Sequence, residues 1–416
     1  MLKKYIIVTI IAIITFLPAS AYCQANDSRV RTVLKILGEG LKNKDIELTR
    51  KTFAEDVSIS TEMGIGTNNL LETILQHVNF ESVELLPGSM HASKDTLYVD
   101  ARFILQQGKP QESIIALDSE NRILFIDYFD RLFGHSRYRV PSLVAVIPFR
   151  QEGQSVILSL KLNNSDHPMS FLLDTGANGM AIRKSLADSL SIKSDYAQRA
   201  NIVGGHTQVN ISTGNTVHLT DSLSLTQQNM AIFNEVRNNL DGIIGLNLIK
   251  KYITKIDFDS RKIYLYNFGT FNYVDGGTTI QVRMHRNLIT IPSILNLTGK
   301  ESVMANFLFD MGANYKLIVF SDFVRKNQLL QTGFQPESMG TTVSLGHSTP
   351  VYHGKAYELS IGDIVSNNIP VTLQAASLDN SSQNNGIDGS IGVQFWAGYN
   401  LIIDLLRKEI HLIPRK

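Results

Sequence analysis

The chain is poor in cysteine and in charge of either sign. Its 416 residues include one cysteine, Cys23, and their formal net charge is +1. Because Cys23 lies near the N-terminus, the remainder can hold no disulfide, no thiol nucleophile and no cysteine-based metal site. No basic run follows the first residues, so nothing points to a nucleic acid partner. The apolar content of 43% is that of folded proteins, and the length predicts two or three domains.

Long hydrophobic runs are also missing, except for one at the N-terminus. Two lysines precede an apolar run at 5–17, which a proline and small residues follow. This pattern predicts a signal peptide at 1–25 and an extracytoplasmic protein, periplasmic or secreted. About 13 apolar residues fall short of the roughly 20 that span a bilayer, so we expect no membrane span after cleavage. Lipid attachment at Cys23 is the less favoured alternative, because bulky Tyr22 precedes it.

The next segment, 26–135, predicts an α+β domain. Helical patterns come first and extended runs follow, at 28–41, 46–53 and 70–78 and then at 82–86, 96–105, 112–117 and 123–128. The first helix, the KNKDIELTRKTFAEDVSIS segment and the ALDSENRILFIDYFD hairpin together resemble the cone-shaped NTF2-like (SnoaL-like) family. That resemblance implies a cone that often holds a small molecule. No constellation of residues demands one here, so we expect an interaction or folding-assisting role.

The rest of the chain contains a duplication. Residues 171–178 (FLLDTGAN) and 307–314 (FLFDMGAN) match at six of eight positions. Residues 241–265 also align without gaps on 388–412, at a constant offset of 147 positions. We therefore predict two related lobes, at 136–270 and 271–416.

Each copy presents an aspartate directly after an apolar strand, Asp174 in the first and Asp310 in the second. Amide hydrolysis without a metal needs one carboxylate to take a proton from water and a second to protonate the carbonyl oxygen. Gly176 and Gly312 are small enough to let the two carboxylates approach each other. A single Asp-x-Gly would only indicate a turn, but its recurrence in both copies predicts a catalytic pair.

These motifs resemble those of the aspartic peptidases over about 144–416. Each lobe looks like a retropepsin unit, and the tandem looks like the bilobal pepsin arrangement. The family order continues with a Gly-rich hairpin and a hydrophobic-hydrophobic-Gly string before a helix, found here as Gly204 and Gly205 with 243–245, and as Gly346 with 390–392. The resemblance implies a mainly β fold, two retropepsin-like barrels that form a pepsin-like acid protease after the α+β cone.

The resemblance also implies a mechanism. Asp174 and Asp310 would meet between the lobes and share a proton, because like charges a few ångströms apart cannot both ionise. The hairpin at Gly204 and Gly205 would be a flap over an extended peptide or protein substrate, although glycine pairs also form simple turns. Since both lobes lie in one chain, we expect a monomer, and we expect no cofactor and no metal.

The sequence departs from the family at two points. In the family the threonine of each Asp-Thr-Gly braces the opposite loop through its hydroxyl. Here the second copy has Met311, so only Thr175 can brace. The residues after the motifs are Ala177 and Ala313, where pepsin-type enzymes have a hydroxyl that stabilises the ionised pair. We therefore expect the shared proton to persist to higher pH, with optimal activity in the weakly acidic to near-neutral range.

Four other polar residues near these motifs have plainer interpretations. His206 and His347 follow flap-like glycines but lack partner ligands, so we expect solvated histidines. Asp241 and Asp388 precede the hydrophobic-hydrophobic-Gly strings, where we expect turn or capping residues.

Three functions remain open from the sequence. The first is an exported aspartic endopeptidase with Asp174 and Asp310 as its catalytic pair. The second is a peptide-binding pseudopeptidase that has lost turnover, for which Met311 is the best support. The third leaves the two lobes as a scaffold and places ligand binding in the N-terminal cone.

Overall fold

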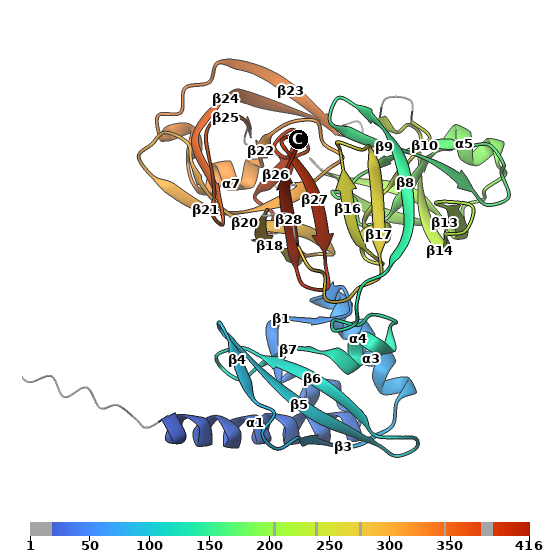
Figure 1. Cartoon of the computed structure of the whole chain (residues 1–416). Helices are drawn as coiled ribbons and strands as arrows, with labels where there is room; N and C mark the ends of the chain where they lie inside the picture. The colour runs from blue at the N-terminus through green and yellow to red at the C-terminus, as the bar shows by residue number, and fades with distance from the viewer. Residues whose placement is uncertain (1–18, 203–204, 238–239, 274–276, 345–346, 376–385) are drawn as a thin grey trace, which may run out of the picture. The chain divides into compact units, whose positions relative to one another are not determined.

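The computed structural model describes residues 19–202, 205–237, 240–273, 277–344, 347–375 and 386–416. The chain divides into two compact units (Figure 1). The smaller comprises the residues up to Val57 and Leu71–Tyr128, and the larger comprises Ser58–Leu70 and Phe129–Lys416. Strands predominate, which confirms the mainly β fold class. None of the helices in the described part of the chain combines the length and apolar character that a bilayer span requires.

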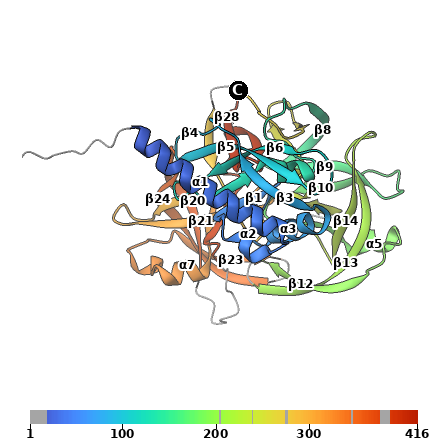
Figure 2. The same ribbon diagram turned by 90° about the horizontal axis from the view of Figure 1, so that it is seen from below.

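The smaller unit packs a long helix on an antiparallel sheet. Helix α1 (Ala19–Lys42) packs on β3 (Phe80–Leu85) (Figure 2), and its residues Val30, Leu34 and Leu37 are buried as the periodicity predicts. The sheet continues through β4 (His91–Ser93), β5 (Thr96–Leu105), β6 (Gln111–Leu117), β7 (Ile123–Ile126) and β1 (Phe53–Ile59). The order is β1-β7-β6-β5-β3, with β4 beside β5.

Several predicted boundaries in this region were wrong. The helix expected at 46–53 ends at Arg50 as α2 (Ile46–Arg50), and Phe53 opens β1 instead. The chain leaves the helix where Thr52 donates its hydroxyl to the carbonyl of Thr49, and a strand with a buried C-terminal half follows. Helix α3 (Ile65–His77) begins earlier than expected, and α4 (Asp127–Leu132) replaces the expected end of the last strand.

The larger unit contains the residues of both predicted lobes, and lobe 1 and lobe 2 below denote the segments 136–270 and 271–416. In lobe 1 the regular elements are β8 (Leu143–Glu152), β9 (Ser155–Leu162), β10 (Met169–Leu173), β11 (Met180–Arg183), α5 (Lys184–Ser189), β12 (Tyr196–Ile202), β13 (Gly205–His218), β14 (Ser224–Phe233), β15 (Gly242–Ile244), α6 (Leu246–Ile249), β16 (Ile253–Asp257) and β17 (Lys262–Tyr266). The short strand β2 (Glu62–Met63) pairs with Ser58 and Ile59 at the end of β1.

Lobe 2 repeats this order of strands, with η2 added after α7 and no helix in the position of α6. Its elements are β18 (Thr278–Gln281), β19 (Arg283–His285), β20 (Leu288–Asn296), β21 (Ser302–Asp310), β22 (Leu317–Val319), α7 (Ser321–Lys326), the 3-10 helix η2 (Leu329–Gln331), β23 (Ser338–Ser344), β24 (His347–Ile361), β25 (Ile364–Gln374), β26 (Gly389–Gly392), β27 (Tyr399–Asp404) and β28 (Glu409–Pro414). The strands at 156–162, 169–173, 288–297 and 303–309 were predicted to within a residue or two.

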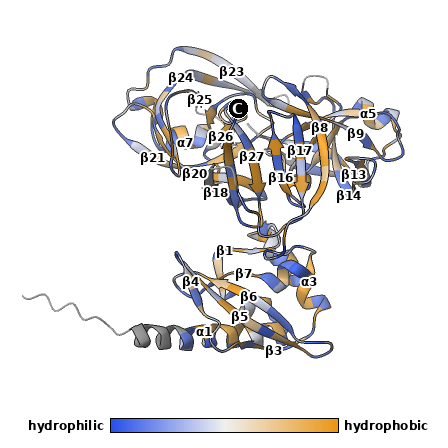
Figure 3. Ribbon diagram, viewed as in Figure 1, coloured by the Kyte–Doolittle hydropathy of each residue, from blue (hydrophilic) through white to orange (hydrophobic). Residues whose placement is uncertain are grey.

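Two sheets organise the lobes. One runs β12-β13-β14-β11-β15-β10-β9-β8-β17-β16-β27-β28-β18, and a β13–β9 pairing curls its first part closed. The other runs β19-β20-β21-β26-β22-β25-β24-β23, and β20 pairs with β24 in the same way. Strand β16 of lobe 1 pairs with β27 of lobe 2, so the lobes share one continuous sheet. Figure 3 shows β8 and β27, in this shared part, as predominantly hydrophobic.

One predicted helix is absent from lobe 2. In lobe 1, α6 directly follows Gly245 as expected. After Gly392 the chain instead makes successive turns, in which Phe395 N–H donates to Gly392 O and Trp396 N–H donates to Val393 O. The aromatic side chains decide this, because Trp396 is fully buried edge-on against Phe309. Packing outweighs the weak helix propensity of this segment.

Candidate active site

Asp174 lies immediately after β10, at a tight turn. Its backbone N–H donates to Ile244 O at 3.0 Å, which holds it beside β15. Its carboxyl accepts a hydrogen bond at Oδ1 from the N–H of Gly176, at 2.8 Å. The N–H of Ala177 donates to Asp174 O at 3.2 Å and closes the turn. The carboxyl is therefore fixed by the backbone of its own motif.

Asp310 is held in the same way in lobe 2. It is the last residue of β21 and pairs in parallel register with Gly392 of β26. The N–H of Gly312 donates to its Oδ1 at 3.1 Å, as Gly176 does for Asp174. A further donor has no counterpart around Asp174: the hydroxyl of Ser390 donates to Asp310 Oδ2 at 3.2 Å.

The carboxyls of Asp174 and Asp310 lie close together. A Cβ added to Gly176 would lie 2.9 Å from Asp310 Oδ1 and 3.1 Å from Asp174 Oδ1, so one methyl-sized group would touch both. A Cβ on Gly312 would come within 2.2 Å of the Asp174 carboxyl. The side chains also hydrogen-bond to each other. A side chain at either glycine would therefore obstruct the close approach of the two carboxyls.

A single threonine braces the two loops. The hydroxyl of Thr175 donates to Phe309 O at 2.6 Å and accepts from the N–H of Met311 at 2.9 Å. Met311 has no exposed surface and packs in the core that includes Phe309. The brace therefore runs from lobe 1 to lobe 2 only, and an apolar side chain fills the position of the second hydroxyl.

Burial sets the protonation of this pair. Desolvation raises the pKa of Asp174, while the N–H of Gly176 opposes this rise. Desolvation and the facing carboxyl of Asp174 raise the pKa of Asp310 to about 8. Arg237 donates to Gly312 O and its positive charge lowers the pKa of Asp174, so Asp310 is the better holder of a shared proton. Two like charges at this distance favour a pair with one proton.

The aspartates before the hydrophobic-hydrophobic-Gly strings have equivalent structural contacts. Asp241 Oδ2 accepts the N–H of Ser170, and Asp388 Oδ2 accepts the N–H of Asn306. Asp241 also binds Arg183 at 2.7 Å. Both side chains satisfy the backbone of the strand that leads to a central aspartate, which agrees with a structural role.

The predicted flap glycines lie at two hairpins. Gly204 and Gly346 fall outside the described residues, and Gly205 is the first residue of β13. The flanking strands are described: β12 pairs antiparallel with β13, and β23 pairs antiparallel with β24. The side chains of His206 and His347 lie outside the described part of the structure. Each lobe therefore carries a hairpin at the equivalent point of the chain.

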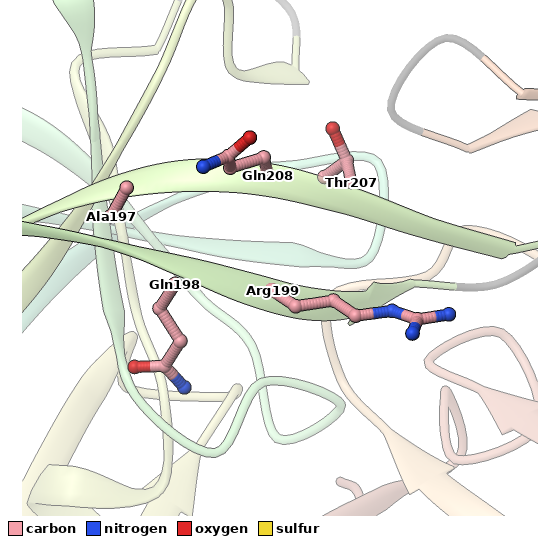
Figure 4. A pocket seen from close by; sticks show the side chains of 5 residues that line it. All are labelled: Ala197, Gln198, Arg199, Thr207 and Gln208. Atoms are coloured by element: carbon pink, nitrogen blue, oxygen red, sulfur yellow. The ribbon is translucent and has the colours of Figure 1, made fainter.

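A pocket of about 330 Å³ lies on the lobe 1 hairpin (Figure 4). Its lining consists of side chains from both strands, Ala197, Gln198, Arg199, Thr207 and Gln208. It is open to solvent, and no acidic residue is among these lining residues. Over the described ranges, no group of three or more histidine, cysteine, aspartate or glutamate side chains could hold a metal ion.

Sequence reasoning missed Ser390 and Tyr315. Tyr315 interacts through its hydroxyl with Ser390 and Asp310, and burial raises its pKa well above its usual value. A signal was present in the duplication, because Ser390 aligns with Ile243 and is the polar exception in an otherwise apolar string. Within the hydrophobic-hydrophobic-Gly string at 390–392, the hydroxyl of Ser390 was overlooked.

Comparison with known proteins found one family model and one solved structure similar to parts of this chain. The family model for aspartyl proteases matches residues 158–248, which include Asp174 and the string before α6. An aspartic proteinase from Irpex lacteus is similar in structure at 14% sequence identity and a TM-score of 0.41, with 67% of this chain and 98% of that chain covered. The comparison with curated proteins found no match.

Proposed function

We propose that this protein is an exported aspartic endopeptidase that cleaves peptide bonds with Asp174 and Asp310. The observation that carries the proposal is the direct approach of these two buried carboxyls, one from each lobe. The matching hydrogen bonds from Gly176 and Gly312 orient them alike. Paired carboxyls with displaced pKa values are the arrangement that acid–base hydrolysis requires.

The reaction follows from one shared proton. The ionised carboxylate, Asp174, removes a proton from a water molecule, whose oxygen forms a bond to the peptide carbonyl carbon. Asp310 gives its proton to the carbonyl oxygen, which yields a neutral tetrahedral diol. Asp310 then recovers a proton from that diol as the C–N bond breaks. Asp174 transfers its proton to the leaving amine, and the pair returns to its starting state.

The substrate is an extended peptide or protein segment. Strands β12 and β23 are the outermost strands of their sheets, so each has a free edge among the described strands. Figure 2 shows β12 and β23 reaching toward each other from the two lobes. An extended chain can add to such an edge through main-chain hydrogen bonds, and its side chains then provide selectivity.

A peptide-binding pseudopeptidase is the second candidate. The specific observation in its favour is Met311, which leaves the pair with the single brace of Thr175. A looser pair would still present both carboxyls to a bound chain. Such a protein would bind a statine-type transition-state mimic without cleaving a peptide.

Cleavage of an unstructured polypeptide across a pH series tests the proposal. The variants are Asp174→Asn and Asp310→Asn, each of which removes one ionisable group at nearly constant volume. Asp188→Asn is the matched control, because Asp188 is an exposed carboxylate that pairs with Lys184 on α5. We expect cleavage to disappear in the first two variants and to remain in the control.

Three outcomes separate the candidates. Cleavage by the parent protein that survives both asparagine variants would overturn the proposed function. Tight binding of the statine mimic with no cleavage at any pH would favour the pseudopeptidase. If neither occurs, ligand binding by the N-terminal domain becomes the hypothesis to test.

Export and a monomeric state belong to the same proposal. The support for export is the apolar run and small residues at the N-terminus. The support for a monomer is that both carboxyls come from one chain. Cell fractionation and size-exclusion chromatography test these two points, and a cytoplasmic protein or an activity that rises with dimer fraction would contradict them.

A further inference from the structure

A hydroxyl from a neighbouring strand holds the outer side of Asp310. Oδ1 of Asp310 faces lobe 1, where it approaches the position of Gly176, and it accepts the N–H of Gly312. Oδ2 accepts the hydroxyl of Ser390 at 3.2 Å. Ser390 is fully buried in the middle of β26, between Leu308 of β21 and Ile318 of β22. Both oxygens of Asp310 are therefore engaged, which restricts rotation of the carboxyl.

Tyr315 extends this contact into a small network. Its hydroxyl interacts with both Ser390 and Asp310. Its ring is fixed by packing, because a Cβ on Gly392 would lie 2.8 Å from the Tyr315 ring and 2.4 Å from its carbonyl oxygen. The N–H of Gln394 also donates to Tyr315 O at 3.2 Å. Two hydroxyls thus approach Asp310 from its own lobe.

Lobe 1 has no equivalent network. The duplication aligns Ser390 with Ile243 and Tyr315 with Gly179, and neither carries a hydroxyl. In lobe 2 the residue directly after the motif is Ala313, which also lacks one. Ser390 therefore supplies to Asp310, from β26, a hydroxyl that the motif itself does not contain.

We propose that Ser390 is a positioning residue for Asp310, that Tyr315 supports it, and that this one-sided network distinguishes the two aspartates in catalysis. The inference rests on the proposed function and deepens it. The network turns Oδ1 of Asp310 toward Asp174 and the reacting carbonyl. It also stabilises the ionised form of Asp310, so Asp310 gives up the shared proton at a lower pH than it would without these hydroxyls.

Few ionisable groups face Asp310, so a change in its proton loss can be assigned to Ser390. Across the interface it faces Asp174, and from its own loop it faces Tyr315. Arg237 reaches the backbone carbonyl of Gly312 from lobe 1. Within β26 itself there is no ionisable side chain, so Ser390 acts there as a neutral donor.

The test is the pH dependence of kcat/KM for Ser390→Ala. Loss of the donor disfavours ionised Asp310, so we expect the alkaline limb to move up by about one pH unit. Tyr315→Phe should move the same limb upward by a smaller amount, because Ser390 remains. Ser293→Ala is the matched control: Ser293 is also buried in a lobe 2 strand, but its hydroxyl donates to Ile291 O. We expect its limb to stay in place.

A second readout does not depend on turnover. Ionising buried Asp310 costs folded-state stability, and that cost stops growing once the residue has lost its proton, at about pH 8 in Ser293→Ala. The melting temperature of Ser390→Ala should therefore keep falling to higher pH, and the two variants should diverge between about pH 7 and about pH 9. An active parent with the same alkaline limb in Ser390→Ala would overturn the inference and leave the proposed function intact. A parent without cleavage would overturn the proposed function, and the melting temperatures would still decide whether Ser390 controls Asp310.

Discussion

Lys255 pairs with Ile402 across the antiparallel ladder of β16 and β27, and these two residues are also equivalent in the duplicated sequence. On either side, Thr254 pairs with Ile403 and Ile256 pairs with Leu401. Ile403 is the equivalent of Ile256, and Leu401 is the equivalent of Thr254. When two residues pair and their equivalents also pair with each other, the ladder has a twofold relationship. The local twofold therefore passes through the Lys255–Ile402 pair.

Gly312→Ala should abolish most of the activity and leave the fold intact. Its Cβ would come within 2.2 Å of the Asp174 carboxyl, so that side chain must move. A displacement of this kind typically reduces the rate about a hundredfold. The control is Gly179→Ala, because a Cβ on Gly179 meets nothing within 4 Å. Initial cleavage rates and circular dichroism of both variants check this, and an active Gly312→Ala enzyme would contradict the site geometry.

Thr175→Val should weaken both stability and catalysis. Valine keeps the shape but loses the hydroxyl, which leaves Phe309 O and Met311 N–H without their buried partner. We expect a loss of about 2 kcal/mol in the free energy of unfolding. Thr226→Val, on the exposed face of β14, should change it little. Urea unfolding measures both values, and equal stability of the two variants would show that the brace contributes nothing.

Activity should be greatest in the weakly acidic to near-neutral range. The pair needs one proton, and the pKa of Asp310 is raised to about 8 by burial and by the facing Asp174. Activity should therefore fall as the pH passes about 8, when Asp310 loses its proton. A pH–rate profile of kcat/KM measures the two limbs. An optimum near that of pepsin would contradict the expectation.

Stability should also decline with pH, and the sign follows from the same group. The folded-state pKa of Asp310 lies above the usual aspartate value of about 4. Stability from its protonated form is fully present below about pH 4 and is lost as the pH rises through about 8. Asp404, whose pKa burial raises to about 6, adds a smaller loss in the same direction. The melting temperature of Asp310→Asn should therefore depend less on pH than that of the parent.

Arg137→Met should destabilise the larger unit strongly. Arg137 is buried and binds Asp130 at 2.6 Å, while it also donates to Leu406 O. Its removal breaks the ion pair of Arg137 with the Asp130 carboxylate, which has no exposed surface, at a cost of about 4 kcal/mol. Arg150→Met is the control, because the Arg150–Glu152 pair is exposed and such pairs contribute little. Chemical denaturation measures the midpoint of unfolding of each variant, and similar midpoints would contradict the prediction.

The strands that lead to Asp174 and Asp310 could be predicted because local sequence carries their signal. Apolar runs bounded by turn residues indicate strands, and a gapless repeat indicates equivalent lobes. The turns after Gly392 could not be predicted in this way. There, burial of Trp396 against Phe309 outweighs local propensity, and those residues are distant in sequence.

The chain on its own determined that two aspartates, each with a small neighbour, stand at equivalent points of a repeated unit. Folding decided that the carboxyls touch, that the hydroxyl of Thr175 braces the opposite loop, and that the hydroxyl of Ser390 donates to Asp310 and not to Asp174. The reason is physical. Propensity and patterning act between near neighbours, whereas hydrogen bonds and desolvation depend on which distant segments share the same few ångströms.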